Sequence, residues 1–297
     1  MNRKERRAAE KRRDEAAKRQ DAVADGAASV GIADLAVEAS RLRGMGRLDE
    51  AQRICRRILV REPAHVPTLN LLGLIAQATG DHRGAVKTFA KAIAADEANA
   101  ACHFNAGNSY QTLGNRAKAI ACFGKALMLG MEDKAVPFIL QNPAISAYVR
   151  RIASKWPLPV TSAELFGAEG VAPLAKDLFL CAAMEATLLP NVQLEGLLGY
   201  ARAEMLRLAA AKGQDDDDIV VFACALARQC FVNEYIYVQS EAEIGLAAAV
   251  RDRLVQSLAS EAAITPFLLA VGRTLAARIR HDNKRYSDSV KMARAAE

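Results

Sequence analysis

The sequence predicts an all-α fold in which three helical hairpins are followed by a helical C-terminal region. Three observations support this prediction. Small and aromatic residues repeat at an interval of 34, apolar residues recur at helical spacing, and clusters of glycine, proline or acidic residues separate these stretches. With 297 residues, 52% of them hydrophobic, the chain can bury a substantial core and is long enough for two domains.

The chain begins with a basic segment. Residues 1 to 20 contain nine lysines and arginines against four acidic residues, and such an arm could neutralise phosphates on nucleic acid. However, the acids are interleaved with the bases, as Asp14 and Lys18 are at an (i, i+4) spacing, and no aromatic residue that could stack on a base precedes Phe89. We therefore expect residues 1–28 to form a disordered or fraying helical tail, and we do not expect nucleic acid as a partner.

Residues 29–133 contain three units of one repeat. The turn glycines Gly46, Gly80 and Gly114 are 34 residues apart. Four further columns share this interval: Ala39, Gly73 and Gly107; Ala51, Ala85 and Ala119; Cys55, Phe89 and Phe123; and Ile58, Ala92 and Ala126. A constant period over several columns is typical of stacked repeats.

Each unit is predicted to be a helical hairpin. In the second unit, apolar residues at helical spacing stand on both sides of the turn segment TGDHRG. The small residues Gly73 and Ala85 would let the two helices approach closely, with the larger Leu72 and Phe89 filling the space around them. One hairpin cannot bury its own apolar face, so neighbouring hairpins must stack.

These columns resemble the tetratricopeptide repeat, whose pattern places leucine, glycine and an aromatic residue before alanine, aromatic and alanine positions. The second and third units carry the resemblance through Leu69, Leu72, Gly73, Ala76, Ala85, Phe89 and Ala92, and through Gly107, Tyr110, Ala119, Phe123 and Ala126. The first unit matches least well, and the later units have Glu97 and Met131 where the pattern has a closing proline. The resemblance implies a right-handed superhelix whose concave face is lined by the first helix of each hairpin.

The resemblance also implies a protein or peptide partner on this concave face. The side chains that would face the partner are Asn70, Leu74, Gln77, Phe104, Asn105, Asn108 and Gln111. Amide side chains can pair with both the donors and the acceptors of a peptide backbone. The alternative is that the polar members of this set are solvated and that Leu74 and Phe104 belong to the core.

One mode of recognition within the family is not expected here. Tetratricopeptide domains that hold a C-terminal carboxylate use lysine and arginine on the concave face. At the matching places this chain has Ala36, Ser40, Leu71 and Ala101.

After Asp133 the period is lost, while helical patterning continues to about residue 280. The segments PLPVTSAELFGAEGV, PNV and QDDDD break this pattern, so residues 134–280 are predicted to be a helical domain and residues 281–297 a basic tail. Asp218 is expected to cap the helix that begins with IVVFACALARQ. We do not expect a metal at DDDD, because consecutive carboxylates on a loop repel one another.

A second resemblance suggests an alternative function. The stretches LCAAMEATLLPNVQLEGLLGYAR and DDDDIVVFACALARQCFVNEYIYVQSEAE are similar to the helical region that links tetratricopeptide repeats to a class I S-adenosylmethionine-dependent methyltransferase domain in bacterial proteins. This implies a non-catalytic, substrate-recruiting or regulatory portion of a split or truncated methyltransferase, acting with a catalytic partner. The catalytic domain has no counterpart here, because no glycine-rich loop stands between a strand and a helix.

No other constellation predicts chemistry. The six cysteines include no CxxC pair and no histidine at a matching spacing, and no nucleophile stands beside a base, so we expect no metal, no cofactor and no catalytic residue. No apolar run reaches the roughly 18 to 20 residues of a membrane-spanning helix. We expect no membrane partner and a cytoplasmic location, where cysteines stay reduced.

Overall fold

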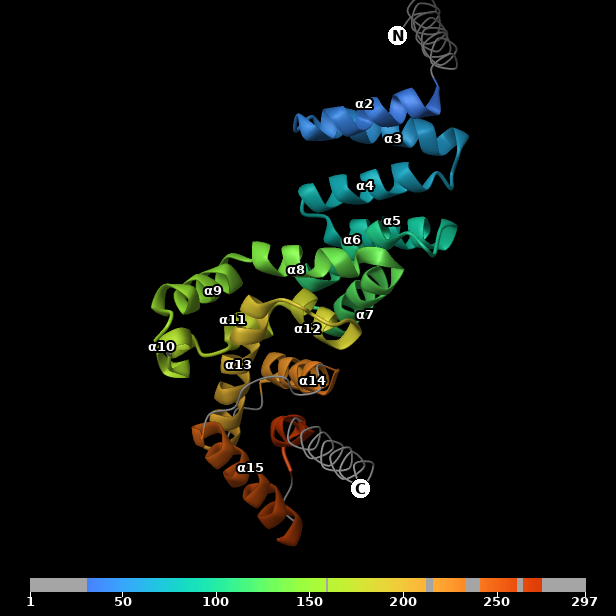
Figure 1. The fold of residues 1–297 in the computed structure, drawn as a ribbon. Helices are drawn as coiled ribbons and strands as arrows, with labels where there is room; N and C mark the ends of the chain where they lie inside the picture. Colours follow the sequence, from blue (N-terminus) through green and yellow to red (C-terminus); the bar gives the residue numbers. More distant parts are fainter. Residues whose placement is uncertain (1–30, 159, 212–215, 233–240, 261–263, 274–297) are drawn as a thin grey trace, which may run out of the picture. The chain divides into compact units, whose positions relative to one another are not determined.

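The computed structural model describes residues 31–158, 160–211, 216–232, 241–260 and 264–273. Within these ranges every element is helical, so the predicted all-α fold is confirmed (Figure 1). The predicted tails, residues 1–28 and 281–297, lie outside the described residues. By its contacts the chain divides into two compact units, of which the first ends at Ala98 and the second begins at Asn99. The predicted boundary after residue 133 therefore falls inside the second unit.

The first unit contains two helical hairpins. Helix α2 (Ile32–Gly44) packs against α3 (Leu48–Arg61), and α4 (Val66–Ala78) packs against α5 (His82–Ala95). Contacts between α3 and α4 join the two hairpins. Their shared core consists of Ala39, Leu42, Ala51, Cys55, Leu71 and Ile75.

The turn glycines end the first helix of each hairpin in the same way. Gly80 has a φ of +79°, its N–H donates to Gln77 at 3.0 Å, and the N–H of Asp81 donates to the carbonyl of Ala76 at 2.8 Å. The side chain of Asp81 then accepts from the N–H of Gly84 at 2.8 Å and caps α5. Gly46 and Gly114 repeat the positive φ and the backbone bonds, so this column is glycine because the turn needs a left-handed residue.

The second glycine column lets the helices of a hairpin approach closely, as predicted. A Cβ atom added to Gly73 would lie 2.4 Å from Cε1 of Phe89 on the paired helix. At Gly107 the corresponding distance to Phe123 is 2.6 Å. Both phenylalanines are fully buried, whereas Leu72 is only half-buried at the edge of the core. In the second and third units, the glycine of one column therefore packs directly against the phenylalanine of the other column.

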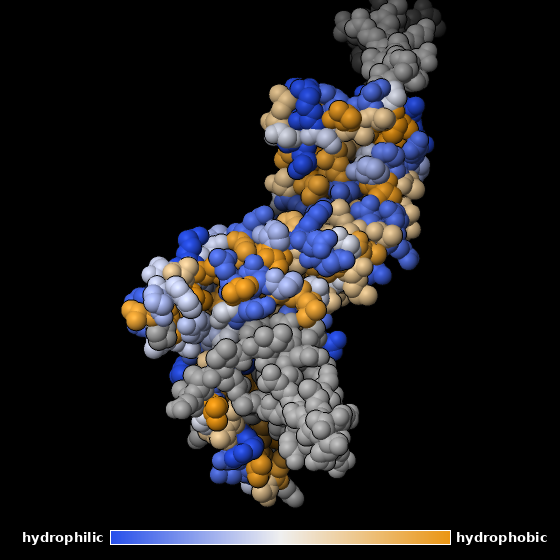
Figure 2. All heavy atoms as spheres, viewed as in Figure 1, coloured by the Kyte–Doolittle hydropathy of each residue, from blue (hydrophilic) through white to orange (hydrophobic). Residues whose placement is uncertain are grey.

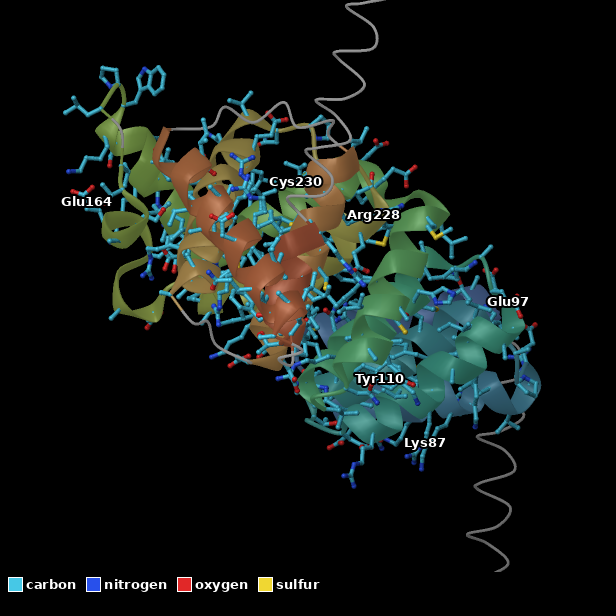
Figure 3. All side chains as sticks on the ribbon, turned by 90° about the horizontal axis from the view of Figure 1, so that it is seen from below. Lys87, Glu97, Tyr110, Glu164, Arg228 and Cys230 are labelled. Atoms are coloured by element: carbon cyan, nitrogen blue, oxygen red, sulfur yellow. The ribbon has the colours of Figure 1, made fainter. Side chains whose placement is uncertain are left out.

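The second unit begins with the third hairpin, α6 (Ala100–Thr112) and α7 (Arg116–Ala126). Tyr110 of α6, labelled in Figure 3, lies half-buried with Nζ of Lys118 5.5 Å from its ring centroid. A π-helical turn, η1 (Leu127–Met131), follows α7 and bends the chain at Gly130, where φ is +98°. The chain then enters α8 (Glu132–Gln141).

Helical segments of 3 to 13 residues follow α8 in the sequence and precede a buried helix. They are α9 (Pro143–Lys155), α10 (Ser162–Phe166), the 3-10 turn η2 (Gly167–Glu169) and α11 (Ala172–Ala175). Glu164, labelled in Figure 3, forms a capping box with Thr161 at the start of α10, and the pKa of its carboxyl is lowered by these hydrogen bonds.

Helix α12 (Leu178–Ala186) is the buried one. Its residues from Leu178 to Met184 are all buried, as expected for a helix that is apolar on every side. It packs against α7, so the apolar face of the third hairpin is covered by a helix far along the sequence instead of by a fourth repeat.

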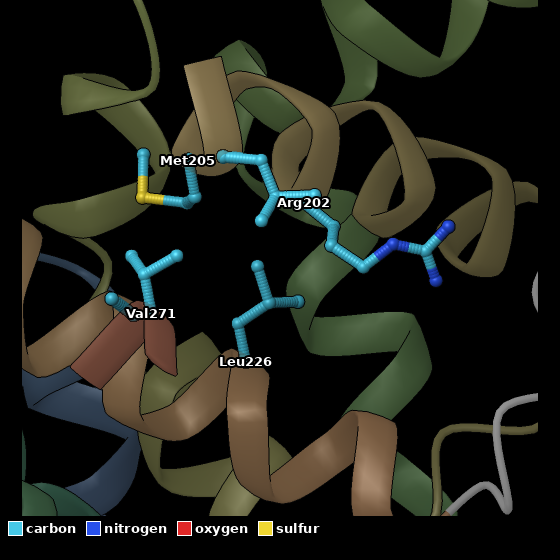
Figure 4. A pocket seen from close by; sticks show the side chains of 6 residues that line it. Arg202, Met205, Leu226 and Val271 are labelled. Atoms are coloured by element: carbon cyan, nitrogen blue, oxygen red, sulfur yellow. The ribbon is translucent and has the colours of Figure 1, made fainter. Parts of the chain in front are cut away.

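Three long helices and the helical segment 266–273 close the core of the second unit. The long helices are α13 (Val192–Ala210), α14 (Asp217–Val232) and α15 (Glu241–Ala259). Buried Arg202 of α13 pairs with buried Glu243 of α15, with Nε 3.0 Å from Oε1, and this ties the two helices together. Figure 4 shows the guanidinium of Arg202 pointing away from Met205, Leu226 and Val271, which enclose a space too small for a water molecule.

The start of α14 differs from the prediction. Asp216, not Asp218, supplies the side-chain oxygen at this end, because its Oδ1 accepts from the N–H of Asp218 at 2.8 Å. The helix begins at Asp217, two residues earlier than a cap at Asp218 would allow. The carboxylate of Asp218 is free to pair with Arg116 at the start of α7.

The surface is mixed in character. Figure 2 shows hydrophilic and hydrophobic residues interspersed over the visible face of the described parts. Exposed large apolar side chains include Val60, Trp156, Leu158 and Leu258. None of the helices searched among the described residues is both long enough and apolar enough to cross a membrane.

Candidate functional site

A pocket of about 260 Å³ opens beside α6 in the second unit. Helix α6 contributes Phe104, Asn108 and Gln111, which are spaced so that they share one face of the helix. The other lining residues come from outside the repeats and are Phe138, Asn142, Pro173, Lys176, Asp177 and Phe179. The pocket is therefore built jointly by the third hairpin and the helices that follow it.

Three aromatic rings form the apolar part of the pocket. The ring centroid of Phe104 lies 5.0 Å from that of Phe138 and 5.5 Å from that of Phe179. Phe179 also contacts buried Phe123 edge to face, with the centroids 5.3 Å apart. Phe104 and Phe138 are half-buried, so part of their ring surface remains open to solvent. Because the rings brace one another, their positions are fixed before any ligand arrives.

Asn142 and Asp177 form a fixed polar wall. The side-chain amide of Asn142 donates to Oδ2 of Asp177 at 2.7 Å, while its own Oδ1 caps α9 by accepting from the N–H of Ala144 at 2.9 Å. Oδ1 of Asp177 caps α12 by accepting from the N–H of Leu180 at 2.9 Å. The two side chains thus join two helix N-termini, and their main hydrogen-bonding groups are already used.

The rim of the pocket offers groups that are not used in this way. Gln111 and Lys176 are exposed, and Asn108 is half-buried. Within the part of the chain that the structure describes, the side chains of these three residues make no hydrogen bond or ion pair. The rim therefore presents two amides and one ammonium group above an aromatic floor, an arrangement suited to holding a ligand that has both apolar and polar parts.

The structure brings together three of the seven residues predicted to face a partner: Phe104, Asn108 and Gln111. Asn105 lies half-buried on the same helix, outside the pocket lining. Asn70, Leu74 and Gln77 are half-buried on α4, in the first unit. Phe104, for which a core role was the alternative, is both part of the aromatic cluster and part of the pocket floor.

Six lining residues were not predicted from the sequence. Asn142 stands before a proline and Asp177 before an apolar run, so both could have been identified as helix N-caps. A capping signal does not show which other helix lies nearby. The position of Lys176 beside the pocket follows from the contacts of α12 with α7 and α8. These contacts join residues far apart in the sequence, so no local pattern indicates them.

The cysteines lie outside the pocket lining. Burial raises the pKa of the thiols of Cys55 and Cys230 to about 11 and raises the pKa of Cys181 further. They pack as small apolar residues. The first histidine also has a structural role, since His65 caps α4 by accepting from the N–H of Thr68.

Comparison with known families finds the tetratricopeptide repeat twice. Its family models match residues 66–99 and residues 100–133, which are the second and third units of the predicted repeat. The helices α4 to α7 fall within these two segments. A search of curated proteins found no match to the chain.

Proposed function

We propose, on the premise that these matches identify tetratricopeptide repeats, that the protein is an interaction scaffold that binds a peptide segment of a partner protein at the pocket beside α6. Repeats of this kind generally mediate protein–protein interaction. The observation that carries the proposal is that three residues assigned to the concave face by the repeat pattern line one pocket.

The size and chemistry of the pocket support a peptide ligand. Its volume of about 260 Å³ lies below the range of roughly 300 to 1,000 Å³ that is common for small-molecule and cofactor sites. One or two side chains of a partner would fill it. The amides of Asn108 and Gln111 can then pair with the N–H and C=O groups of the partner's backbone. Asn105, and in the first unit Asn70, Leu74 and Gln77, remain candidate contacts to be tested separately.

The proposal is tested by selecting peptides from a random library displayed on phage, with the full-length chain as bait. A double variant, Asn108→Ala with Gln111→Ala, removes both rim amides. Gln256→Ala is the matched control, because Gln256 is exposed on α15, away from the pocket lining. We expect the wild type and the control to enrich the same sequences and the double variant to lose them. Equal enrichment by all three proteins would contradict the proposal.

The sequence resemblance to methyltransferase-linked helical regions supports a second function, in which the chain recruits substrate for a separate catalytic subunit. Under this alternative the chain alone should not bind S-adenosylmethionine, whereas a complex captured from its native host should transfer methyl groups from that cofactor. Calorimetric titration of the chain with S-adenosylmethionine should show no binding under either proposal. Saturable binding would reveal a cofactor site in the chain.

We also propose a reducing compartment, the bacterial cytoplasm, as the location. The support is that none of the six cysteines, all of which lie in the described ranges, forms a disulfide, and that each is buried or half-buried.

A further inference from the structure

We propose that the pocket beside α6 selects partner segments in which an apolar side chain stands next to the carboxylate of an aspartate or glutamate, and that Lys176 recognises this carboxylate. The inference rests on the proposed function, because it specifies the partner of the same site. It identifies the partner by its chemistry: an internal, acidic–apolar peptide segment.

The charges around the pocket support an acidic partner. Lys176 and Asp177 are the two charged residues among those that line it. The carboxylate of Asp177 accepts from Asn142 and from the backbone at the start of α12, where the helix dipole also favours a negative charge. Lys176 is exposed and makes no ion pair with any residue in the described ranges. Asp177 keeps its negative charge, but its oxygens already accept hydrogen bonds within the protein, so the charged group that is free to contact a ligand is the ammonium of Lys176.

The three aromatic rings of the pocket explain why the partner segment needs an apolar side chain. Phe104, Phe138 and Phe179 present ring surface beside the polar rim, so a ligand must cover apolar area while its polar group stays at the edge. Phe179 and Lys176 are only three residues apart in the sequence and line the same pocket. A partner that places an apolar and an acidic side chain next to each other would reach both.

An acidic side chain fits the pocket better than a C-terminal carboxylate does. Capture of a terminal carboxylate commonly uses several donors together, such as lysine combined with arginine, a bidentate arginine or a nest of backbone N–H groups, whereas this pocket offers a single lysine. No arginine lines this pocket, and the cation that does is a lysine, which acts as a flexible point charge. This cation comes from the turn between α11 and α12, so the lack of lysine or arginine at the four concave-face positions Ala36, Ser40, Leu71 and Ala101 does not prevent recognition of a carboxylate.

The phage library already described serves as the first probe, provided that each peptide is fused to the coat protein through its C-terminus. No displayed peptide then has a free terminal carboxylate. We expect the sequences enriched by the wild-type chain to contain an aspartate or glutamate next to an apolar residue. Lys176→Gln should keep the apolar preference and lose the acidic one.

A synthetic peptide made from an enriched sequence, with both ends blocked, measures the effect directly. Lys176→Gln should weaken binding of this peptide about 3- to 5-fold, as expected for a solvent-exposed ion pair, and should not change binding of the same peptide with glutamine in place of its acid. Raising the salt concentration should weaken only the wild-type interaction with the acidic peptide. Lys125→Gln, at an exposed lysine of α7 outside the pocket lining, is the control and should leave both affinities unchanged.

The possible failures are distinguishable. If peptides are enriched without an acidic preference, or if Lys176→Gln weakens the acidic and neutral peptides equally, the inference about Lys176 is wrong while the proposed peptide site stands. If the blocked peptide does not bind and the same peptide synthesised with a free C-terminus does, the carboxylate is terminal and the inference is also wrong. If the double variant at Asn108 and Gln111 enriches the same peptides as the wild type, the proposed function itself fails.

Discussion

Gly107 and Phe123 set the distance between the two helices of the third hairpin. The ring of Phe123 occupies the space that a side chain at Gly107 would need, and Gly73 and Phe89 repeat this arrangement one unit earlier. Because the phenylalanines are fully buried, they cannot move out toward solvent to make room. The repeat therefore preserves a small residue opposite a large one.

Substitution of Gly107 by alanine should destabilise the protein. The added Cβ would lie 2.6 Å from Cδ1 and Cε1 of Phe123, so the helices or the ring must shift, at a cost of about 1 to 3 kcal/mol. Urea unfolding followed by circular dichroism measures the change.

Gly124→Ala provides an internal control with the opposite expected sign. Gly124 lies inside α7, and apart from its two chain neighbours and its own helix backbone no atom of the described residues stands within 4 Å of the position of an added Cβ. Alanine should stabilise the helix there by roughly 0.5 to 1 kcal/mol, because glycine loses more conformational freedom on folding. An equal effect of the two substitutions would show that the contact with Phe123 does not set the hairpin spacing.

At the scale of residues, the packing columns were predictable because both partners of each contact lie in one hairpin. Gly73 and Phe89 are close in sequence, and their interval recurs. Lys176 has no such recurrence. Its place beside Asn108 is set by helices that are distant in the sequence, so the sequence shows an ordinary exposed lysine.

At the scale of elements, the hydrogen bond between Asn142 and Asp177 joins the N-termini of α9 and α12. Each residue also caps its own helix. Since both belong to the pocket lining, the same contacts that begin these helices also fix one wall of the pocket.

Asn142→Ala should therefore affect both stability and binding. Loss of the cap should cost about 0.5 to 2 kcal/mol, and the hydrogen bond to the charged Asp177 should add to this. Peptide affinity should also fall, because Asp177 loses the partner that holds it.

Asn191→Ala separates the two effects. Asn191 caps α13 by accepting from the N–H groups of Gln193 and Leu194, and it is not part of the pocket lining. We expect a similar loss of cap stability and no change in peptide affinity. If Asn142→Ala lowers stability without weakening the peptide, the polar wall has no role in binding.

At the scale of the whole molecule, the sequence predicted the helical class and all three hairpins, because a period of 34 marks each unit and its turn. Past Asp133 it predicted helices without their arrangement. The third hairpin shares a compact unit with α12 instead of closing a separate repeat domain, because Phe179 and the rest of α12 supply the apolar cover that α7 needs. Contacts between helices that are far apart in the sequence, such as α7 and α12, produce no periodic sequence pattern.

The N-terminal segment tests whether recognition is specific or electrostatic. Deletion of residues 1 to 24 should change peptide affinity little at physiological salt, because interleaved charges in solution are strongly screened. The double variant at Asn108 and Gln111 should weaken binding in the same assay while its unfolding curve stays unchanged. If the deletion abolishes binding and the double variant binds normally, the basic segment and not the pocket is the site of recognition.

Hydrogen–deuterium exchange of the full-length chain, with and without an enriched peptide, tests the central claim most directly. The claim is that a pocket built jointly by the third hairpin and later helices binds the partner. We predict slower exchange in three separate segments that contain Phe104 to Gln111, Phe138 to Asn142 and Pro173 to Phe179, with no change in α15. Protection confined to α15 or to the N-terminal segment, with exchange in these three segments unaltered, would contradict the claim.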